Sequence, residues 1–253
     1  MRAKCTMTVA AGLGAMALAS LPSAGAGGPA QAAGAEERAR SAQIPVGPDV
    51  FPTFSNPRRI DNPYLPLSKF RRCVLRGRTD DGTRERSVKR LLRETHPFRI
   101  NGQRVEAAII QDSAFEDGEL AERTRDYFVQ SDEGTVYYLG EHVQNLKNGR
   151  LVNRKGTWLY GKHTNVLGVV MASSPTLGRQ WRAEDVPGVT VESLRVEEVG
   201  MRFRTGGRVY RDVIRIQEFI QPEGDVEYKL YARGTGLIAE YPPDGAVFLQ
   251  GCR

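Results

Sequence analysis

Turn signals that recur along the whole chain, separated by short alternating runs, most constrain how this sequence can fold. Asx-Gly and Gly-Gly pairs supply the positive φ angles that tight hairpins require. Turn signals lie at residues 80–82, 101–102, 116–118, 132–134, 148–149, 206–207, 222–224 and 244–245. Between them, apolar and polar residues alternate with a period of two, as in residues 226–232, which is typical of half-buried strands.

Consecutive hairpins without crossover helices predict an antiparallel β-meander. Strands this numerous usually curl into a half-barrel or a closed barrel, so we expect an all-β domain with little helix. Its core is expected to include Tyr127 or Phe128, Tyr138, Trp158, Val170 and Tyr228. The longest irregular stretch, residues 160–175, is expected to be a loop of the kind that often carries function.

The first 26 residues have the pattern of a secretory signal peptide. Arg2 and Lys4 form a positive region, residues 6–21 form an apolar region, and small residues allow cleavage after Ala26 or Ala32. The apolar region is shorter than the roughly 20 residues that a membrane-spanning helix needs. The sequence therefore predicts a protein that is secreted or located in the cell envelope.

The rest of the chain divides into a linker and one domain. Residues 27–49 are rich in Ala, Gly and Pro and poor in large apolar groups, which predicts a disordered linker. Residues 50–253 are long enough to form a single β-rich domain with a substantial core. No stretch in them approaches the length of a transmembrane segment.

The charge of the chain does not predict a nucleic-acid partner. The formal net charge is +6, and removal of Arg2 and Lys4 with the signal leaves 6 − 2 = +4. The basic residues are scattered among acidic neighbours, without a basic helix or an aromatic stacking motif. Weak attraction to anionic envelope surfaces is compatible with this charge.

Residues 126–142 concentrate carboxylates, tyrosines and a histidine in one short stretch. The turn signal at residues 132–134 predicts that this stretch is a hairpin with a solvated tip. Asp126, Glu141 and His142 then fall at the other end of the hairpin, where charged groups are usually solvated. Because acid/base catalysis needs pKa values tuned by burial, we interpret this stretch as a hairpin and not as an active site.

Three stretches resemble motifs of an uncharacterised family of secreted bacterial proteins. Residues 62–67 read NPYLPL against the family's NPYFPL, residues 117–127 read DGELAERTRDY against DGELxExTxDYYAQD, and residues 134–141 read GTVYYLGE against GNVWYFGE. The resemblance covers nearly all of the chain after the signal, and it implies no known activity. Phe70 and Cys73 depart from the family, which usually has a Gly and a Trp or Tyr there. The opening of the domain, a Pro-Leu pair followed by a strand, is also similar to the opening of domains that have the curved sheet of lipoprotein-carrier proteins.

Motifs for metals, cofactors and nucleophilic catalysis are missing from the sequence. His96, His142 and His163 have none of the close spacings that metal ligands show. The sequence contains neither a G-x-S-x-G elbow nor a G-x-x-x-x-G-K-[ST] loop. We therefore expect no metal and no cofactor, and the sequence favours a protein that is not an enzyme.

A glycoside hydrolase that uses paired carboxylates is the enzymatic alternative. Such a pair would have to lie roughly 5–10 Å apart. The candidate carboxylates are Glu141, Glu184 and Asp185. The aromatic residues that could stack on a sugar, and that otherwise belong to the core, are Trp158, Tyr160 and Trp181.

The sequence predicts a non-enzymatic domain that binds an apolar or amphiphilic, envelope-derived small ligand on the concave face of the sheet. Trp158, Tyr160 and Trp181 are the candidate ligand-binding residues, and the oligomeric state stays open. A continuous apolar cavity would favour binding. A cleft with two facing carboxylates beside Trp158 or Trp181 would favour hydrolysis.

Two cysteines remain after Cys5 is removed with the signal, an even number in an oxidising compartment. Cys73 lies in the first predicted strand, and Cys252 follows the last one. If the meander closes or nearly closes, these strands become neighbours, and the Cα atoms can come within the roughly 4.4–6.8 Å of a disulfide. We predict a Cys73–Cys252 bridge, with two free thiols as the alternative.

Overall fold

The computed structural model describes residues 50–222 and 224–253. The predicted signal peptide and linker, residues 1–49, lie outside the described residues. The described chain is almost entirely β-structure, with one 3-10 turn, η1 (Leu67–Lys69), and no α-helix. Within this part of the chain, no helix has the length and apolar character needed to cross a membrane.

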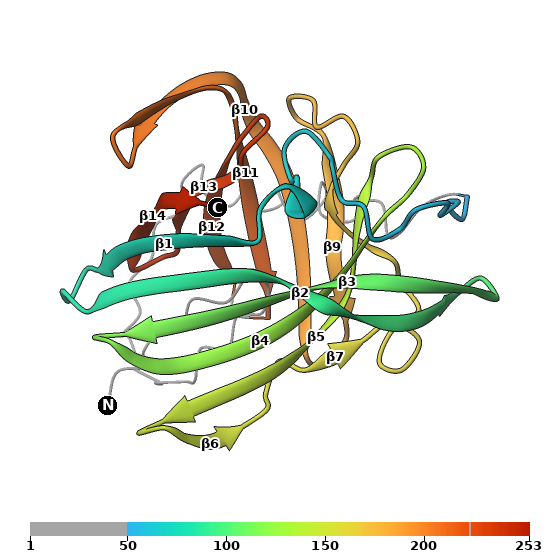
Figure 1. Ribbon diagram of the computed structural model, residues 1–253, viewed down its shortest axis with the longest axis horizontal. Helices are drawn as coiled ribbons and strands as arrows, with labels where there is room; N and C mark the ends of the chain where they lie inside the picture. Colours follow the sequence, from blue (N-terminus) through green and yellow to red (C-terminus); the bar gives the residue numbers. More distant parts are fainter. Residues whose placement is uncertain (1–49, 223) are drawn as a thin grey trace, which may run out of the picture.

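Fourteen strands form a single curved, unclosed sheet in which every pairing is antiparallel (Figure 1). The strands are β1 (Arg72–Thr79), β2 (Arg84–Ile100), β3 (Gln103–Glu116), β4 (Glu119–Gln130), β5 (Val136–Lys147), β6 (Arg150–Asn153), β7 (Trp158–Leu159), β8 (Gly168–Met171), β9 (Gln180–Val186), β10 (Thr190–Thr205), β11 (Arg208–Gln221), β12 (Asp225–Ala232), β13 (Gly236–Tyr241) and β14 (Gly245–Cys252). Their order is β6-β5-β4-β3-β2-β1-β14-β13-β12-β11-β10-β9, and β7 and β8 pair with β5. The predicted all-β meander with little helix is confirmed.

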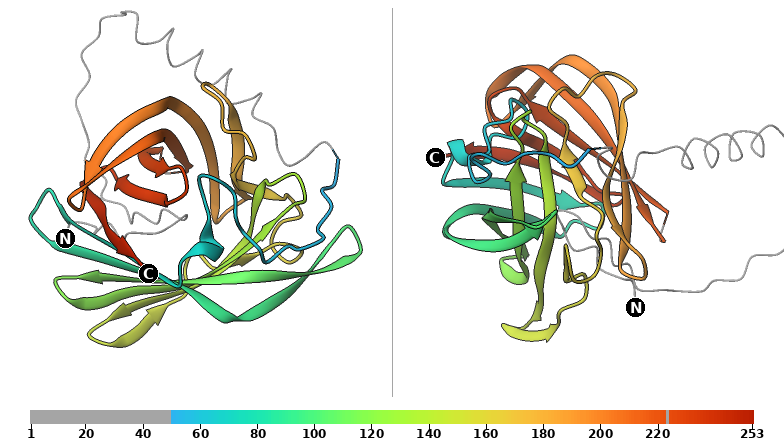
Figure 2. Two further views of the ribbon diagram at one scale, coloured as in Figure 1. Left: turned by 45° about the horizontal axis from the view of Figure 1, so that its top comes forward. Right: turned by 90° about the vertical axis from the view of Figure 1, so that its right-hand side faces the viewer.

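The sheet curls so that its two ends approach each other. In Figure 2 (left), the orange and red strands β10–β14 arch over the teal and green strands β1–β5. Strand β8 lies between the two halves, where a Cβ atom on Gly168 would be 1.8 Å from the carbonyl oxygen of Ala183 in β9. Only glycine allows this approach. The prediction that residues 160–175 form an irregular loop is wrong in part, because β8 lies within them.

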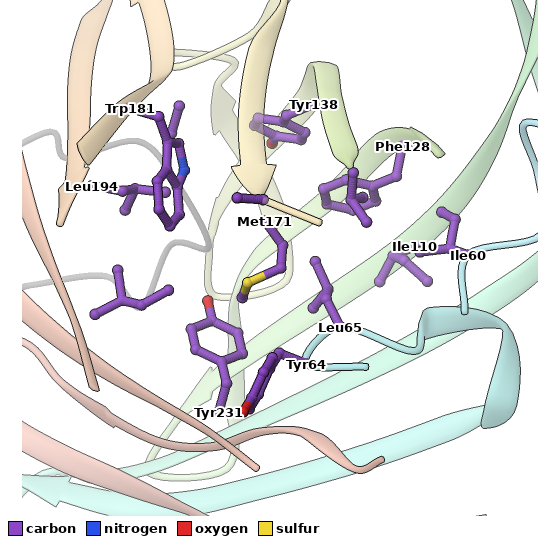
Figure 3. Packing of buried hydrophobic residues seen from close by; sticks show 14 of the residues in the cluster. Ile60, Tyr64, Leu65, Ile110, Phe128, Tyr138, Met171, Trp181, Leu194 and Tyr231 are labelled. Carbon is purple, nitrogen blue, oxygen red and sulfur yellow. The ribbon is translucent and has the colours of Figure 1, made fainter. Parts of the chain in front are cut away.

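Three clusters of buried apolar residues cover both faces of the sheet. The central cluster fills the curl and contains Phe128, Tyr138 and Trp181 (Figure 3). Trp158 belongs to the same cluster. The second cluster packs on the opposite face of β2–β5 and contains Tyr127. The third lies among β1 and β11–β14, with partly buried residues of β10 packed against it. Long strands such as β3, β4 and β5 therefore bury both sets of alternating side chains along part of their length.

Most of the predicted core residues are buried, but Tyr228 is not one of them. Val170 is half-buried and packs against the central cluster. Tyr228 is also half-buried, and the Arg215 guanidinium lies 5.3 Å from the centre of its ring. On β12 the four consecutive residues 229–232 are buried, so both sides of the second half of the strand face apolar or ionisable clusters. The prediction for Tyr228 is wrong because the first half of this strand, residues 225–228, is only half-buried on either side.

The predicted disulfide between Cys73 and Cys252 is confirmed. The two residues are directly opposite each other in the pairing of β1 with β14, and their Cα atoms are 4.1 Å apart. This distance lies just below the predicted range, because opposed residues of antiparallel strands approach to about 4.5 Å. The bridge joins the first and the last strand of the meander across 179 residues of chain.

Replacing both cysteines, as Cys73→Ala with Cys252→Ala, should lower the free energy of unfolding by about 2–5 kcal/mol, because the crosslink restricts the unfolded chain. Urea denaturation of the variant and of the oxidised wild type measures the difference. Wild type in excess reductant serves as the control and should match the variant. Equal stability of all three samples, or two alkylated cysteines on the native secreted chain, would contradict a bridge with this effect.

Candidate functional site

The NPYLPL segment, residues 62–67, closes one end of the interior. The Asn62 side chain donates hydrogen bonds from Nδ2 to the carbonyl oxygens of Gly134 (2.8 Å) and Ala172 (3.1 Å). Its Oδ1 accepts hydrogen bonds from the amides two and three residues further on, at 2.9 and 3.2 Å. Leu65 is thereby held with its side chain in the central cluster (Figure 3).

An apolar cavity of about 90 Å³ lies between this segment and the sheet. Its partly buried lining residues include Leu67, Phe70, Cys73, Leu91, Thr235 and Leu237. Its buried lining residues include Leu65, Leu75, Ile110, Phe128, Asp126, Lys229, Tyr231 and Glu240. Because the charged members are buried and the half-exposed ones are mostly apolar, the cavity runs from an apolar mouth to an inner end with ionisable groups.

Buried ionisable side chains surround the interior of the curled sheet. We define the carboxylate belt as eight buried acids, Asp112, Glu122, Asp126, Glu141, Glu184, Glu192, Glu218 and Glu240. Each lies close enough to other ionisable groups of this set for their charges to interact. Together with Lys89 and Lys229, they come from strands β2–β5 and β9–β13. Two cations therefore face an excess of carboxyl groups.

The two lysines are paired within the belt. Lys89 Nζ donates a hydrogen bond to Asp112 Oδ2 at 2.6 Å and lies 4.0 Å from Glu240 Oε1. Lys229 Nζ donates to Glu218 Oε2, and both of these side chains are 4% exposed. Burial alone would lower the pKa of Lys89, but the carboxylates of Asp112 and Glu240 outweigh it and raise that pKa. Both lysines are therefore charged at neutral pH.

The acids of the belt that do not pair with a lysine have higher pKa values than free carboxyl groups. Burial raises the pKa of Glu122 to about 8 and that of Glu184 to about 7. Burial and the neighbouring Asp112 raise the pKa of Asp126 to about 8. The pKa of Glu141 is raised well above its usual value, first by burial and then by Glu184. At neutral pH the belt therefore contains protonated carboxyl groups that can donate hydrogen bonds.

The structure brings the predicted pair Glu141 and Glu184 together beside Trp158. Gly140 (φ 119°) allows β7 to approach β5, since a Cβ atom there would lie 2.2 Å from the Trp158 carbonyl oxygen. Trp158 Nε1 then donates a hydrogen bond to Glu184 Oε1 at 3.3 Å. Glu141 and Glu184 are both 0% exposed, and neither lines the apolar cavity. A sugar has no path to them in this conformation.

The three aromatic residues predicted to bind a ligand lie in different places. Trp158 and Trp181 are buried in the central cluster. Tyr160 is half-buried and packs against the second cluster, on the other face of the sheet. None of them lines the apolar cavity, so their role in binding stays a prediction. Asp185, the third carboxylate candidate, is half-buried and follows Glu184 on the alternate face of β9.

The hairpin in residues 126–142 is confirmed, but the expectation that its charged end is solvated is wrong for two residues. Strands β4 and β5 are 12 residues long each and continue well past the short strands expected from the turn. Asp126 and Glu141 are directly opposite each other within the paired strands, and they are 1% and 0% exposed. The tip behaves as expected, because Asp132 and Glu133 are exposed.

The histidines take part in local contacts. His163 Nδ1 accepts a hydrogen bond from the Leu159 amide at 2.9 Å. The ring of His96 packs against that of Tyr127, and the Tyr127 hydroxyl lies 2.7 Å from His142 Nδ1. Across residues 50–222 and 224–253, no group of three or more His, Cys, Asp or Glu residues forms a candidate metal site.

Comparisons with known proteins give a structural match of low similarity. No protein-family model and no curated protein matches the chain. The chain is similar to the crystal structure of a candidate lipoprotein from Parabacteroides distasonis, with 8% sequence identity and a TM-score of 0.40. The match covers 75% of this chain and 98% of the other.

Proposed function

We propose that this chain is a secreted or envelope-located, non-enzymatic protein that binds an apolar molecule carrying one polar group. The apolar cavity that ends at the carboxylate belt is the observation that carries this proposal. Its apolar walls favour burial of hydrocarbon, and its inner end offers hydrogen bonds from Lys89, Lys229 and protonated acids such as Asp126. These polar groups would fix the orientation of the ligand.

The size of the cavity limits how the ligand is held. Small-molecule sites usually occupy about 300–1,000 Å³, whereas this cavity is about 90 Å³. A smaller void of about 20 Å³ shares Phe128, Val170, Lys229 and Tyr231 with it. The cavity therefore holds one end of a ligand, and the rest lies at the mouth formed by Leu67, Phe70 and Leu237, or inside a cavity that widens on binding.

The location and the family are parts of the same proposal. The Cys73–Cys252 disulfide supports an oxidising compartment outside the cytoplasm. The N-terminal pattern supports export, and the NPYLPL motif supports membership of the uncharacterised secreted family. In this fold, the motif also supplies Leu65, Pro66 and Leu67 to the cavity wall.

Filling the cavity should weaken ligand binding. Leu91 lines the cavity and is half-buried, so Leu91→Trp places an indole ring in the space that the ligand would occupy. N-phenyl-1-naphthylamine, an apolar amine that fluoresces when it leaves water, is the probe, and native mass spectrometry of the secreted protein identifies any co-purified molecule. We expect the affinity for the probe to fall at least about tenfold, which corresponds to the loss of about 1.4 kcal/mol.

Leu151→Trp is the matched control, because Leu151 is 50% exposed on β6 and does not line the cavity. This variant should bind the probe like wild type, and circular dichroism should show that both variants are folded. Equal binding by wild type and a folded Leu91→Trp variant would refute the cavity as the site. Turnover of chromogenic glycosides that Glu184→Gln abolishes would favour the glycoside hydrolase instead, for which the contact of Glu184 with Trp158 is the supporting observation.

A further inference from the structure

A polar hollow of about 430 Å³ lies on the opposite face of β3–β5 from the apolar cavity. Its lining contains three arginines, Arg123, Arg125 and Arg154, together with Tyr127, His142 and two glutamines. Every one of these side chains can donate a hydrogen bond, and none carries a negative charge at neutral pH. The hollow is thus a concentration of positive charge and hydrogen-bond donors.

The register of the strands brings these side chains together. Arg125 of β4 is opposite Gln111 of β3 on one side and His142 of β5 on the other. Arg123, two residues earlier and therefore on the same face, is opposite Gln144 of β5. Arg154 joins them from the segment that follows β6. Residues 123–154 thus place three guanidinium groups around one hollow.

The arginines of the hollow lack acidic partners. Among the described residues, none of the three forms an ion pair. The Nε atom of Arg123 is buried and has no hydrogen-bond partner within this part of the chain. A buried donor without an acceptor destabilises the protein by about 1–3 kcal/mol, and more when it is charged. An anion in the hollow would satisfy it.

One side of the hollow is held rigidly. Tyr127 is 4% exposed, and its ring is fixed by contacts with His96 and Phe98 in the second cluster. Its hydroxyl lies 2.7 Å from His142 Nδ1, so the imidazole is fixed as well. The pKa of His142 is lowered, first by burial and then by nearby cations that include Arg154 and Arg125. The positive charge around the hollow therefore contributes to the lowered pKa of His142.

We propose that this hollow binds a phosphate or sulfate monoester carried by a polar molecule such as a sugar. The planar guanidinium fork matches the oxygens of such an anion and binds them in pairs. A hollow of about 430 Å³ is larger than the anion alone and lies in the usual range for small-molecule sites. Gln111 and Gln144 can form hydrogen bonds with hydroxyl groups of the attached molecule.

Calorimetric titrations of the folded protein with glucose 6-phosphate, inorganic phosphate, inorganic sulfate and glucose test the proposal. We expect the first three to bind, glucose 6-phosphate most tightly, and glucose not to bind. Failure of all three anions to bind would overturn the proposal. Sedimentation with phosphatidic acid vesicles, without binding of glucose 6-phosphate, would also overturn it and point to a lipid surface.

Arg123→Gln and Arg125→Gln should each weaken binding of glucose 6-phosphate by about tenfold or more, because each removes charge-assisted hydrogen bonds. Arg204→Gln is the matched control: it removes the same charge from an exposed position of β10 and should leave the affinity unchanged. Equal affinities for all variants would refute the site. The Leu91→Trp variant should still bind the anion, so failure here is distinguishable from failure of the apolar cavity.

Nuclear magnetic resonance of His142 gives an independent readout. The charged or titratable groups facing it are His96 of β2, Arg125 and Tyr127 of β4, Arg154 after β6, and Lys162. Apart from the tyrosine, these groups favour the neutral imidazole. A bound dianion adds negative charge and should raise the pKa of His142. An unchanged titration curve at a phosphate concentration that saturates the heat signal would place the anion elsewhere and refute the proposal.

Discussion

Raising the pH from 5 to 8 should strongly destabilise the folded protein, so that the melting temperature is higher in mild acid than at neutral pH. The cause is the carboxylate belt. Burial raises the pKa of Glu122 and Asp126 to about 8 and that of Glu184 to about 7. The pKa values of Glu141 and Glu192 are also raised well above the usual value.

The sign of the pH dependence follows from which state of the protein, folded or unfolded, binds more protons. A carboxyl group whose pKa is raised by folding stabilises the protein fully below its unfolded pKa of about 4.3. This contribution is lost progressively as the pH rises from there to the folded pKa of about 7–8. Each group contributes a slope of up to about 1.4 kcal/mol per pH unit in that window.

Other ionisable groups make the protein more stable as the pH rises. Each of them is a single group or acts in a lower pH range than the belt. The lowered pKa of His142 adds stability as the pH rises through about 6.5, and this is one group against several carboxyls. The lowered pKa values of the exposed Asp132 and the half-buried Glu106 matter below pH 4.5, where their contribution to stability is lost. The net maximum of stability should therefore lie near pH 5.

Urea denaturation at pH 5, 6, 7 and 8 measures this dependence, and two glutamates of β4 provide a matched pair. Glu122 is buried in the belt, whereas Glu119 is exposed on the same strand. Glu122→Gln should flatten the slope by up to about 1.4 kcal/mol per pH unit, because its carboxyl no longer titrates. Glu119→Gln should leave the slope as in wild type. A stability that is flat or rising from pH 5 to 8 would contradict the expectation.

The features that the sequence predicted correctly depend on local turn chemistry and on topology. Turn residues and alternation predict hairpins because both act over a few neighbouring residues. The Cys73–Cys252 bridge was predictable because a meander that curls back brings its first and last strands together. These predictions did not require knowledge of which side of each strand is buried.

The apolar cavity and the carboxylate belt were not predicted from the sequence. The alternation of β12 was assumed to separate an apolar side that faces the core from a polar side that faces water. In the structure the consecutive residues Leu230 and Tyr231, which lie on opposite sides of β12, are both buried, each in a different cluster. Lys229 is tolerated inside because Glu218 of the neighbouring strand neutralises it. That partner is 11 residues earlier in the chain, so the pattern of one strand could not reveal it.

The arginine hollow was missed for a related reason. Arg123 and Arg125 are flanked by Glu122 and Asp126 in the sequence, and Arg154 is distant from both, so all three were interpreted as scattered charge. Alternation puts Arg123 and Arg125 on one face, while Glu122 and Asp126 point to the interior. The spacing of two residues was the available signal. Its meaning depends on the register of β4 with β3 and β5, which the sequence pattern alone does not supply.

Removing the cation of the buried ion pair should be among the most destabilising single substitutions in the domain. Lys229→Met leaves Glu218 buried without its partner, and both side chains are 4% exposed. We expect a loss of about 3–5 kcal/mol at pH 7, because an unpaired buried carboxylate has lost both water and its counter-ion.

Two further variants separate this charge effect from a loss of packing. Lys229→Met combined with Glu218→Leu removes both charges and should recover most of the stability, since a buried pair replaced by apolar groups is often neutral in effect. Arg215→Met breaks a pair with Glu198 whose side chains are 37% and 42% exposed, and it should cost below about 1 kcal/mol. If urea denaturation gives the same loss for Lys229→Met and Arg215→Met, the pair is not held in a water-poor interior. The belt would then be hydrated, and the pH dependence expected from its buried acids would weaken with it.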